Sequence, residues 1–205
     1  MRKICLTAAT LAVLSVFAAP ALAQSPNNNP DPSCHMCEGV YIPKEEIQAY
    51  MDKAYKERKV DQQDRDIDIG KVHIALGVEH RGKLDKPGNH SVAEHDLVSE
   101  VYHVIDGTAT LVLGPDLVNK QRRPADEETV RLYNGPGNNA DDIRNGKTYH
   151  LKAGDVIVIP AGTGHWFTHI DDHIDYIMVR IDPDKITPLK DEAASKAYLR
   201  DYLKQ

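Results

Sequence analysis

Residues 95–107 read HDLVSEVYHVIDG, and residues 154–165 read GDVIVIPAGTGH. The first stretch places His95 and Glu100 at the head of an alternating apolar run that ends on a glycine. The second contains a glycine turn, an apolar strand, a Pro-x-Gly turn and then His165. Apolar runs of this kind, bounded by turn residues, predict β-strands. Two imidazoles and one carboxylate that converge inside a β-barrel could hold one divalent metal, and we predict such a site.

Both stretches resemble the two sequence motifs of the cupin superfamily, which are small β-barrels that often carry a metal in the bore. The first motif reads His-x-His, three or four residues, Glu, six residues, Gly. His95 stands for its second histidine, Glu100 follows after four residues, and Gly107 follows after six more. The second motif reads Gly, five residues, Pro-x-Gly, two residues, His, three residues, Asn. It is matched at every spacing by Gly154, Pro160, Gly162 and His165.

The chain departs from these motifs at two positions. Ala93 holds the place of the first histidine, and His169 holds the place of the terminal asparagine. The resemblance implies an all-β, jelly-roll-like cupin barrel over residues 70–183. It does not indicate a reaction, because one fold of this kind hosts many different activities.

The resemblance implies that His95, Glu100 and His165 bind one divalent metal. Imidazole nitrogen and carboxylate oxygen are ligands shared by Fe(II), Mn(II), Ni(II) and Zn(II), so the identity of the metal stays open. Alanine has no donor atom, and Ala93 therefore predicts a three-ligand site with an extra open position. His90 and His169 are the two residues that could fill this position instead.

Two further residues are candidates for catalysis. Successive side chains of a strand point to opposite faces, so Tyr102 shares the face of Glu100 and His103 points away. On a regular strand His169 shares the face of His165, but it lies about 13 Å farther along. We therefore expect Tyr102 and His169 to contact the ligand rather than the metal.

Composition and the amino terminus indicate an exported protein. The 205-residue chain carries a formal charge of −6, and without a basic patch it is not expected to bind nucleic acid. Residues 1–23 contain Arg2 and Lys3, an apolar stretch and Ala-Leu-Ala before Gln24, which predicts a secretory signal peptide and no membrane span. Removal of its two cations would take the charge from −6 to −8. We expect a periplasmic or secreted protein.

Four segments flank or interrupt the barrel. Residues 24–42 form a flexible leader with Cys34 and Cys37, for which we favour a disulfide, while redox and metal-bound thiols remain open. Residues 43–69 comprise a helix at 43–59 and an acidic linker at 61–69. An irregular insertion at 114–147 is expected to serve as a lid or an oligomer contact, as in a homodimer. Residues 184–205 form a C-terminal helical segment, with the helix at 191–203.

Between these segments, the strand that begins near residue 71 has one apolar face, which includes Val78, and we interpret His80 on that face as a pocket or core histidine. Residues 171–173 are expected to turn the chain.

Two classes of function fit this sequence. The first is a metal-dependent enzyme acting on a small organic molecule, either by oxygenolysis or as a lyase or isomerase through proton abstraction. The second is a non-catalytic barrel that binds or senses a small ligand. The substrate does not follow from the sequence.

Overall fold

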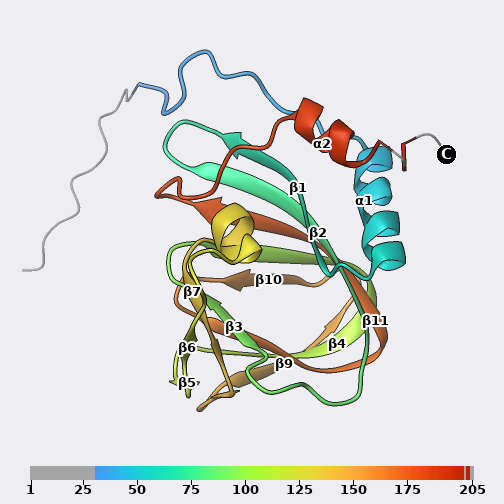
Figure 1. Ribbon diagram of the computed structural model, residues 1–205, viewed down its shortest axis with the longest axis vertical. Coiled ribbons are helices and arrows are strands. Elements are labelled where there is room, and N and C mark those ends of the chain that lie inside the picture. Colours follow the sequence, from blue (N-terminus) through green and yellow to red (C-terminus); the bar gives the residue numbers. More distant parts are fainter. Residues whose placement is uncertain (1–30, 201, 204–205) are drawn as a thin grey trace, which may run out of the picture. The chain divides into compact units, whose positions relative to one another are not determined.

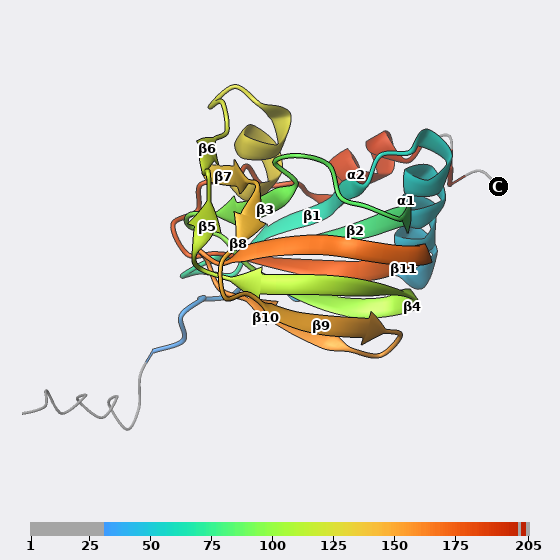
Figure 2. The ribbon, with the colours of Figure 1, turned by 90° about the horizontal axis from the view of Figure 1, so that it is seen from below.

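Two long strands, β4 (Ser99–Gly114) and β11 (Gly164–Asp182), form the centre of a β-barrel (Figure 1). The computed structural model describes residues 31–200 and 202–203. The two strands pair antiparallel and lie side by side along the barrel (Figure 2). The remaining long strands pair with them directly or through a neighbour. These are β1 (Asp61–Asp68), β2 (His73–Leu84), β3 (Val92–His95), β9 (Lys147–Lys152) and β10 (Val156–Ile159).

The interior of the barrel is largely apolar. The buried side chains of its core come from five strands, β4, β9, β10 and both halves of β11 among them. Its larger members are Tyr102, Val104, Leu111, Ile157, Ile159, Phe167, Ile174, Tyr176 and Met178. The predicted all-β barrel, with one helix before it and a short helix after it, is confirmed.

The central strands are irregular where the sequence predicted a turn. Residues 171–173 do not turn the chain, because β11 runs through them and the change of direction is absorbed by bulges in its pairing with β2 and β4. Gly107 lies opposite this region with φ +78°, and a Cβ there would come within 2.1 Å of the His173 carbonyl oxygen. Only glycine can allow this close approach without displacing the backbone.

The predicted acidic linker at 61–69 is wrong, since residues Asp61–Asp68 form strand β1. β1 pairs antiparallel with β2. Its buried side chains are polar, so the apolar period on which strand prediction depends is absent. The Arg65 guanidinium instead donates to both carboxylate oxygens of Glu46, at 3.0 and 2.7 Å. Buried polar groups of this kind are tolerated because they are paired.

The predicted helix at 43–59 is present as α1 (Lys44–Glu57). It buries Tyr50 and Met51 against Val78, so the apolar face of β2 is its outer one. His80, on this outer face, lies 2.6 Å from the carboxylate of Asp175, away from the barrel interior.

The predicted C-terminal helix is present as α2 (Glu192–Tyr198). The carboxylate of Asp191 caps it by accepting a hydrogen bond of 2.8 Å from the amide of Ala194.

The insertion at 114–147 is more ordered than predicted. It contains four short strands and one turn of π-helix. Strand β7 pairs with both β3 and β6, which attaches the insertion to the barrel. The elements are β5 (Leu117–Val118), β6 (Gln121–Arg122), η1 (Val130–Asn134), β7 (Gly137–Ala140) and β8 (Asp142–Ile143).

The N-terminal predictions are reached only in part. A disulfide joins Cys34 and Cys37, as expected, with Cα atoms 5.7 Å apart. The predicted signal peptide at 1–23 and the leader up to residue 30 lie outside the described residues. Among the residues that the structure describes, no helix has the length and apolar character needed to cross a membrane.

Candidate metal centre

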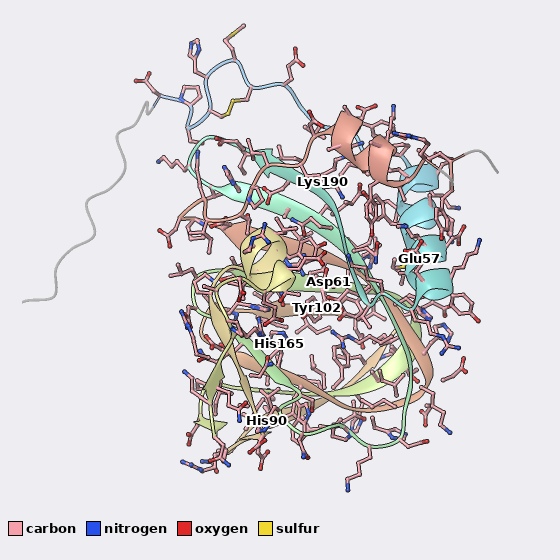
Figure 3. The ribbon with its side chains drawn as sticks, in the orientation of Figure 1. Glu57, Asp61, His90, Tyr102, His165 and Lys190 are labelled. Atoms are coloured by element: carbon pink, nitrogen blue, oxygen red, sulfur yellow. A yellow bond between two sulfur atoms is a disulfide. The ribbon has the colours of Figure 1, made fainter. Side chains whose placement is uncertain are left out.

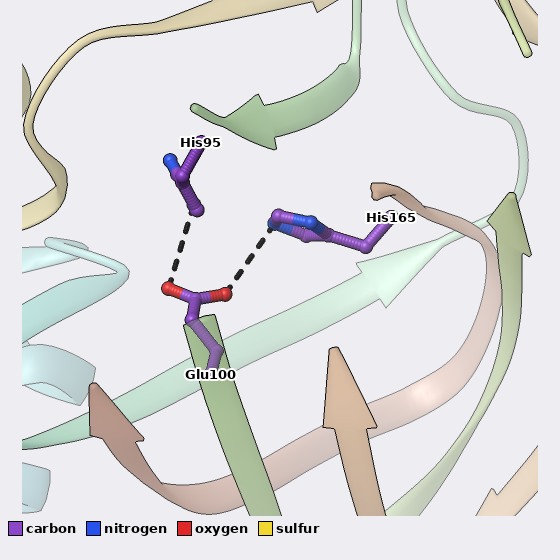
Figure 4. A group of neighbouring side chains, drawn as sticks. All are labelled: His95, Glu100 and His165. Atoms are coloured by element: carbon purple, nitrogen blue, oxygen red, sulfur yellow. Dashed lines mark ion pairs between the residues drawn. The ribbon is translucent and has the colours of Figure 1, made fainter. Parts of the chain in front are cut away.

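His95, Glu100 and His165 converge inside the barrel (Figure 4). The Nε2 atom of His95 lies 3.4 Å from Oε1 of Glu100, and Nε2 of His165 lies 3.7 Å from Oε2 of the same carboxylate. Each residue offers one ligand atom, and these atoms lie within 4.8 Å of one another. All three side chains are buried. The three predicted ligands are therefore brought together.

Backbone pairing fixes the positions of the two histidines. His95 ends β3, and its carbonyl oxygen accepts a hydrogen bond of 2.7 Å from the amide of Gly162. Gly162 belongs to the Pro-x-Gly turn that leads into β11, and its φ of +78° favours glycine. Ala93 on β3 pairs directly with His165 on β11. The motif glycine thus ties the turn before His165 to the residue that supplies the other imidazole.

The carboxylate of Glu100 is held from two sides. The Tyr102 hydroxyl donates to Oε2 at 2.8 Å, and Nε of Arg180 donates to Oε1 at 3.4 Å. Burial alone would raise the pKa of Glu100, but attraction to His95, His165 and Arg180 outweighs it and holds this pKa well below its usual range. Glu100 is therefore an anion at neutral pH.

His165 is arranged to present a free lone pair. Its Nδ1–H donates to the carbonyl oxygen of Thr163 at 3.5 Å, which leaves Nε2 facing Glu100 without a proton. Burial lowers the pKa of His165 to about 4, against the attraction of Glu100. A neutral imidazole and an ionised carboxylate are the forms that ligate a divalent metal. The donor set therefore fits such an ion.

Two adjoining cavities open beside this centre. One, of about 240 Å³, is lined by His95, Glu100 and Tyr102 together with polar residues. The other, of about 280 Å³, is lined by Phe167, Leu84 and Ile170 among others. Four residues line both cavities, and these are Val60, Arg81, Ala93 and His165. The methyl group of Ala93 therefore borders the junction where the motif would place a histidine.

Tyr102 occupies the predicted position beside Glu100. Its ring is buried, stacks at 4.5 Å on Tyr176 and meets the ring of His165 edge-on at 6.3 Å (Figure 3). Burial raises the pKa of Tyr102 well above its usual value, and the charge of Glu100 adds to this effect. Tyr102 therefore keeps its proton and acts as a hydrogen-bond donor.

The expectation that His169 shares the face of His165 is wrong. A bulge separates Phe167 from His169 in the pairing of β11 with β4, and it reverses the alternation of side chains. Ile170 becomes buried, whereas the side chain of His169 is 46% exposed and lies 3.0 Å from Asp171. His169 lines neither cavity.

His90 also lies away from the centre (Figure 3). Its side chain is 41% exposed, and its Nδ1 atom lies 2.6 Å from the carboxylate of Asp141. His90 does not belong to the group of converging ligand atoms. Neither alternative fills the position opened by Ala93, so the described residues provide three ligands.

Sequence reasoning missed Arg123, which lines the smaller cavity from the insertion at 114–147. Its Nη1 atom donates to Nδ1 of His95 at 3.3 Å. The pair Arg122-Arg123 before a proline is visible in the sequence, but no motif spacing connects it to residues on β3. Only the pairing of β6 and β3 with the same strand, β7, brings the two together.

Comparisons with known proteins agree with this fold. Residues 144–201 match the profile of the AraC-like ligand binding domain, a cupin-like domain, which supports the resemblance to cupins. The matched segment contains His165 but neither His95 nor Glu100. No curated protein matches the chain.

Three solved structures are similar to it at low identity. BH2720 from Bacillus halodurans is 12% identical, with a TM-score of 0.40 over 77% of this chain and 93% of that one. DMSP lyase DddQ from Ruegeria pomeroyi DSS-3 is 16% identical, with a TM-score of 0.34 over 56% of this chain and 41% of that one. A cupin protein from Bacteroides fragilis is 12% identical, with a TM-score of 0.32 over 57% of this chain and 72% of that one.

Proposed function

We propose that this cupin-type barrel binds one divalent metal ion through His95, Glu100 and His165 and acts on a small organic molecule in the adjoining cavities. One observation carries the proposal. Three buried side chains of ligand type, from three different strands, direct their ligand atoms at one point. A site with only three protein ligands leaves positions for water or a substrate.

The chain's own residues prepare the site for chemistry. Glu100 is oriented by Tyr102 and Arg180, so its carboxylate stays in place when a ligand enters. The hydroxyl of Tyr102 lines the cavity and keeps its proton, which suits it to donate a hydrogen bond to the oxygen of a bound molecule. A divalent metal, when bound, would act as a Lewis acid on such an oxygen. This arrangement serves oxygenolysis, elimination and isomerisation alike.

A non-catalytic function is the second candidate. The match of residues 144–201 to the AraC-like ligand binding domain supports a barrel that binds or senses a small molecule without converting it. The two functions differ in turnover. Oxygen consumption or product formation by the metal-loaded protein supports the enzyme, whereas saturable binding without any product supports the sensor.

Metal retention tests the proposal directly. The full mature protein is loaded in turn with Fe(II), Mn(II), Ni(II) and Zn(II), desalted, and analysed by inductively coupled plasma mass spectrometry. We expect about one equivalent of at least one metal in the wild type and a loss of that metal in His95→Ala and His165→Ala. A wild type that retains none of the four metals would refute the proposal.

We also propose that the protein is exported, because residues 1–23 have the composition of a signal peptide. Mass spectrometry of the protein from its producing cells is expected to give Gln24 as the first residue. An intact Met1 in the periplasmic or secreted fraction would contradict export by cleavage.

A further inference from the structure

We propose that Arg123 binds the carboxylate group of the ligand, so that the site selects small organic acids. This inference rests on the proposed metal-dependent function and adds the chemical class of the ligand. It depends on the contacts of one buried cation, which lies between a candidate metal ligand and the cavity.

Arg123 is buried without a carboxylate partner. Only 8% of the residue is exposed. Its Nε atom donates to Oδ1 of Asn139 at 2.8 Å, its Nη2 atom donates to the carbonyl oxygen of Asn138 at 3.2 Å, and its Nη1 atom faces Nδ1 of His95 at 3.3 Å. Among the described residues no carboxylate oxygen lies within 4.0 Å of its guanidinium group. A buried guanidinium that contacts only neutral acceptors is an unusual arrangement in a protein interior.

The other two arginines of the same cavity are paired. Arg81 lies 2.8 Å from Glu79. Arg180 lies 2.5 Å from Asp61 and 3.4 Å from Glu100. Both guanidinium groups are therefore neutralised by the protein itself, and Arg123 remains as the cation that is free to bind an anion from solution.

Metal binding would increase this demand for an anion. A metal at Nε2 of His95 requires a proton on Nδ1, because a neutral imidazole has one nitrogen of each kind. Nδ1 could then no longer accept the hydrogen bond from Arg123, and its Nη1–H would be left unpaired beside the cavity. The two oxygens of a carboxylate match the fork of N–H donors that a guanidinium presents.

The charge of the cavity points in the same direction. Its lining includes three arginines and four carboxylates, and the formal balance is −1 with both histidines neutral. A divalent ion would change this balance to +1. The remaining carboxylate, Glu127, accepts a hydrogen bond of 2.8 Å from Thr129 and forms no ion pair with Arg123. The metal-loaded cavity therefore favours a ligand with a negative charge.

Acetate and its neutral analogue acetamide provide matched probes for this site. The full mature protein is loaded with Mn(II), its metal content is measured, and paramagnetic relaxation of the probe's methyl protons is followed as the probe is titrated. We expect saturable binding of acetate and much weaker binding of acetamide in the wild type. In Arg123→Gln, acetate binding should weaken about tenfold or more, since a charge-assisted contact is lost.

Arg122 provides the control, because it is the neighbouring arginine on an exposed strand and pairs with Asp96. Arg122→Gln should bind acetate within about twofold of the wild type, since a rim charge contributes little. An Arg123→Gln variant that retains manganese and binds acetate as the wild type does would overturn the inference and leave the metal site standing. A wild type without retained manganese would overturn the metal-dependent function and this inference with it.

A second measurement covers the case in which Arg123→Gln does not fold. In wild-type protein loaded with Zn(II) and labelled with ¹⁵N-arginine, the Nε–H signal that is missing from Arg123→Lys is assigned to Arg123. Acetate should shift this signal, and acetamide should not. A signal that responds to neither probe would refute carboxylate binding at Arg123.

Discussion

Replacement of Glu100 by glutamine separates the metal site from the fold. Glutamine keeps the shape of the side chain and one carbonyl oxygen, so the Tyr102 hydroxyl still has an acceptor. Arg180 keeps Asp61 as its ionic partner at 2.5 Å. We therefore expect the metal-free variant to fold, with a loss of about 1–2 kcal/mol from the weaker contacts around the former carboxylate. The anionic ligand of the metal, in contrast, is removed entirely.

The expected size of the effect follows from linkage. A metal present at 100 times its dissociation constant stabilises the native protein by about 2.7 kcal/mol, and 1 kcal/mol shifts Tm by about 2–4 °C in a domain of this size. The wild type should therefore gain about 5–11 °C on saturation. If Glu100→Gln binds the metal about a hundredfold more weakly, the same metal concentration gives about 0.4 kcal/mol, or about 1–2 °C.

Thermal unfolding with and without Zn(II), together with the metal content after desalting, measures both quantities. Glu94→Gln is the matched control, because Glu94 is another buried carboxylate next to His95 but accepts from Asn138 at 2.6 Å outside the converging group. The control should keep the full metal-dependent shift of Tm. A Glu100→Gln variant with an undiminished shift would refute the ligand assignment, and so would an equal loss in the control.

Three other expectations concern the remaining departures and one buried acid. Ala93→His should tighten metal retention by on the order of tenfold and lower any turnover, since it adds a donor and fills the junction of the cavities; retention and activity that both stay unchanged would contradict this. His90→Ala and His169→Ala should each retain the metal within about twofold of the wild type, and a loss in either as complete as in His95→Ala would show a fourth ligand. Burial raises the pKa of Asp64 to about 7, against a hydrogen bond from Ser195 that lowers it. Because the folded state then binds the extra proton, this stabilising contribution is complete below about pH 4 and is lost as the pH rises through 7; Asp64→Asn should therefore raise stability at pH 8 by about 1–2 kcal/mol but not at pH 4, as urea unfolding at the two pH values can check.

Much of the candidate site could be predicted from local sequence. The spacing of His95, Glu100 and His165 is set by turns and strand lengths that the chain encodes within each motif, and the glycines at 107 and 162 mark backbone conformations that other residues rarely adopt. Tyr102 follows from the alternation of a regular strand, and Glu100 and Tyr102 do share one face of β4.

The failures have physical causes that a single sequence hides. The alternation rule placed His169 on the wrong face because a bulge in the pairing with β4 has no signature in the residues around it. Strand β1 lacked an apolar period because its buried side chains are satisfied by partners far away in the chain, such as Glu46 for Arg65. Arg123 reached the cavity through pairing between distant strands, which local periodicity does not describe.

The division of labour between barrel and insertion affects how this protein can diversify. All three candidate ligands lie on or next to the long barrel strands, whereas Arg123 and its partners Asn138 and Asn139 lie on the segment between β4 and β9. A change of length or composition in that one segment would alter which molecules are accepted without disturbing the ligand-bearing strands. Recombination between related barrels could therefore transplant specificity as a single cassette of about thirty residues, and laboratory evolution aimed at new ligands should begin with libraries confined to it.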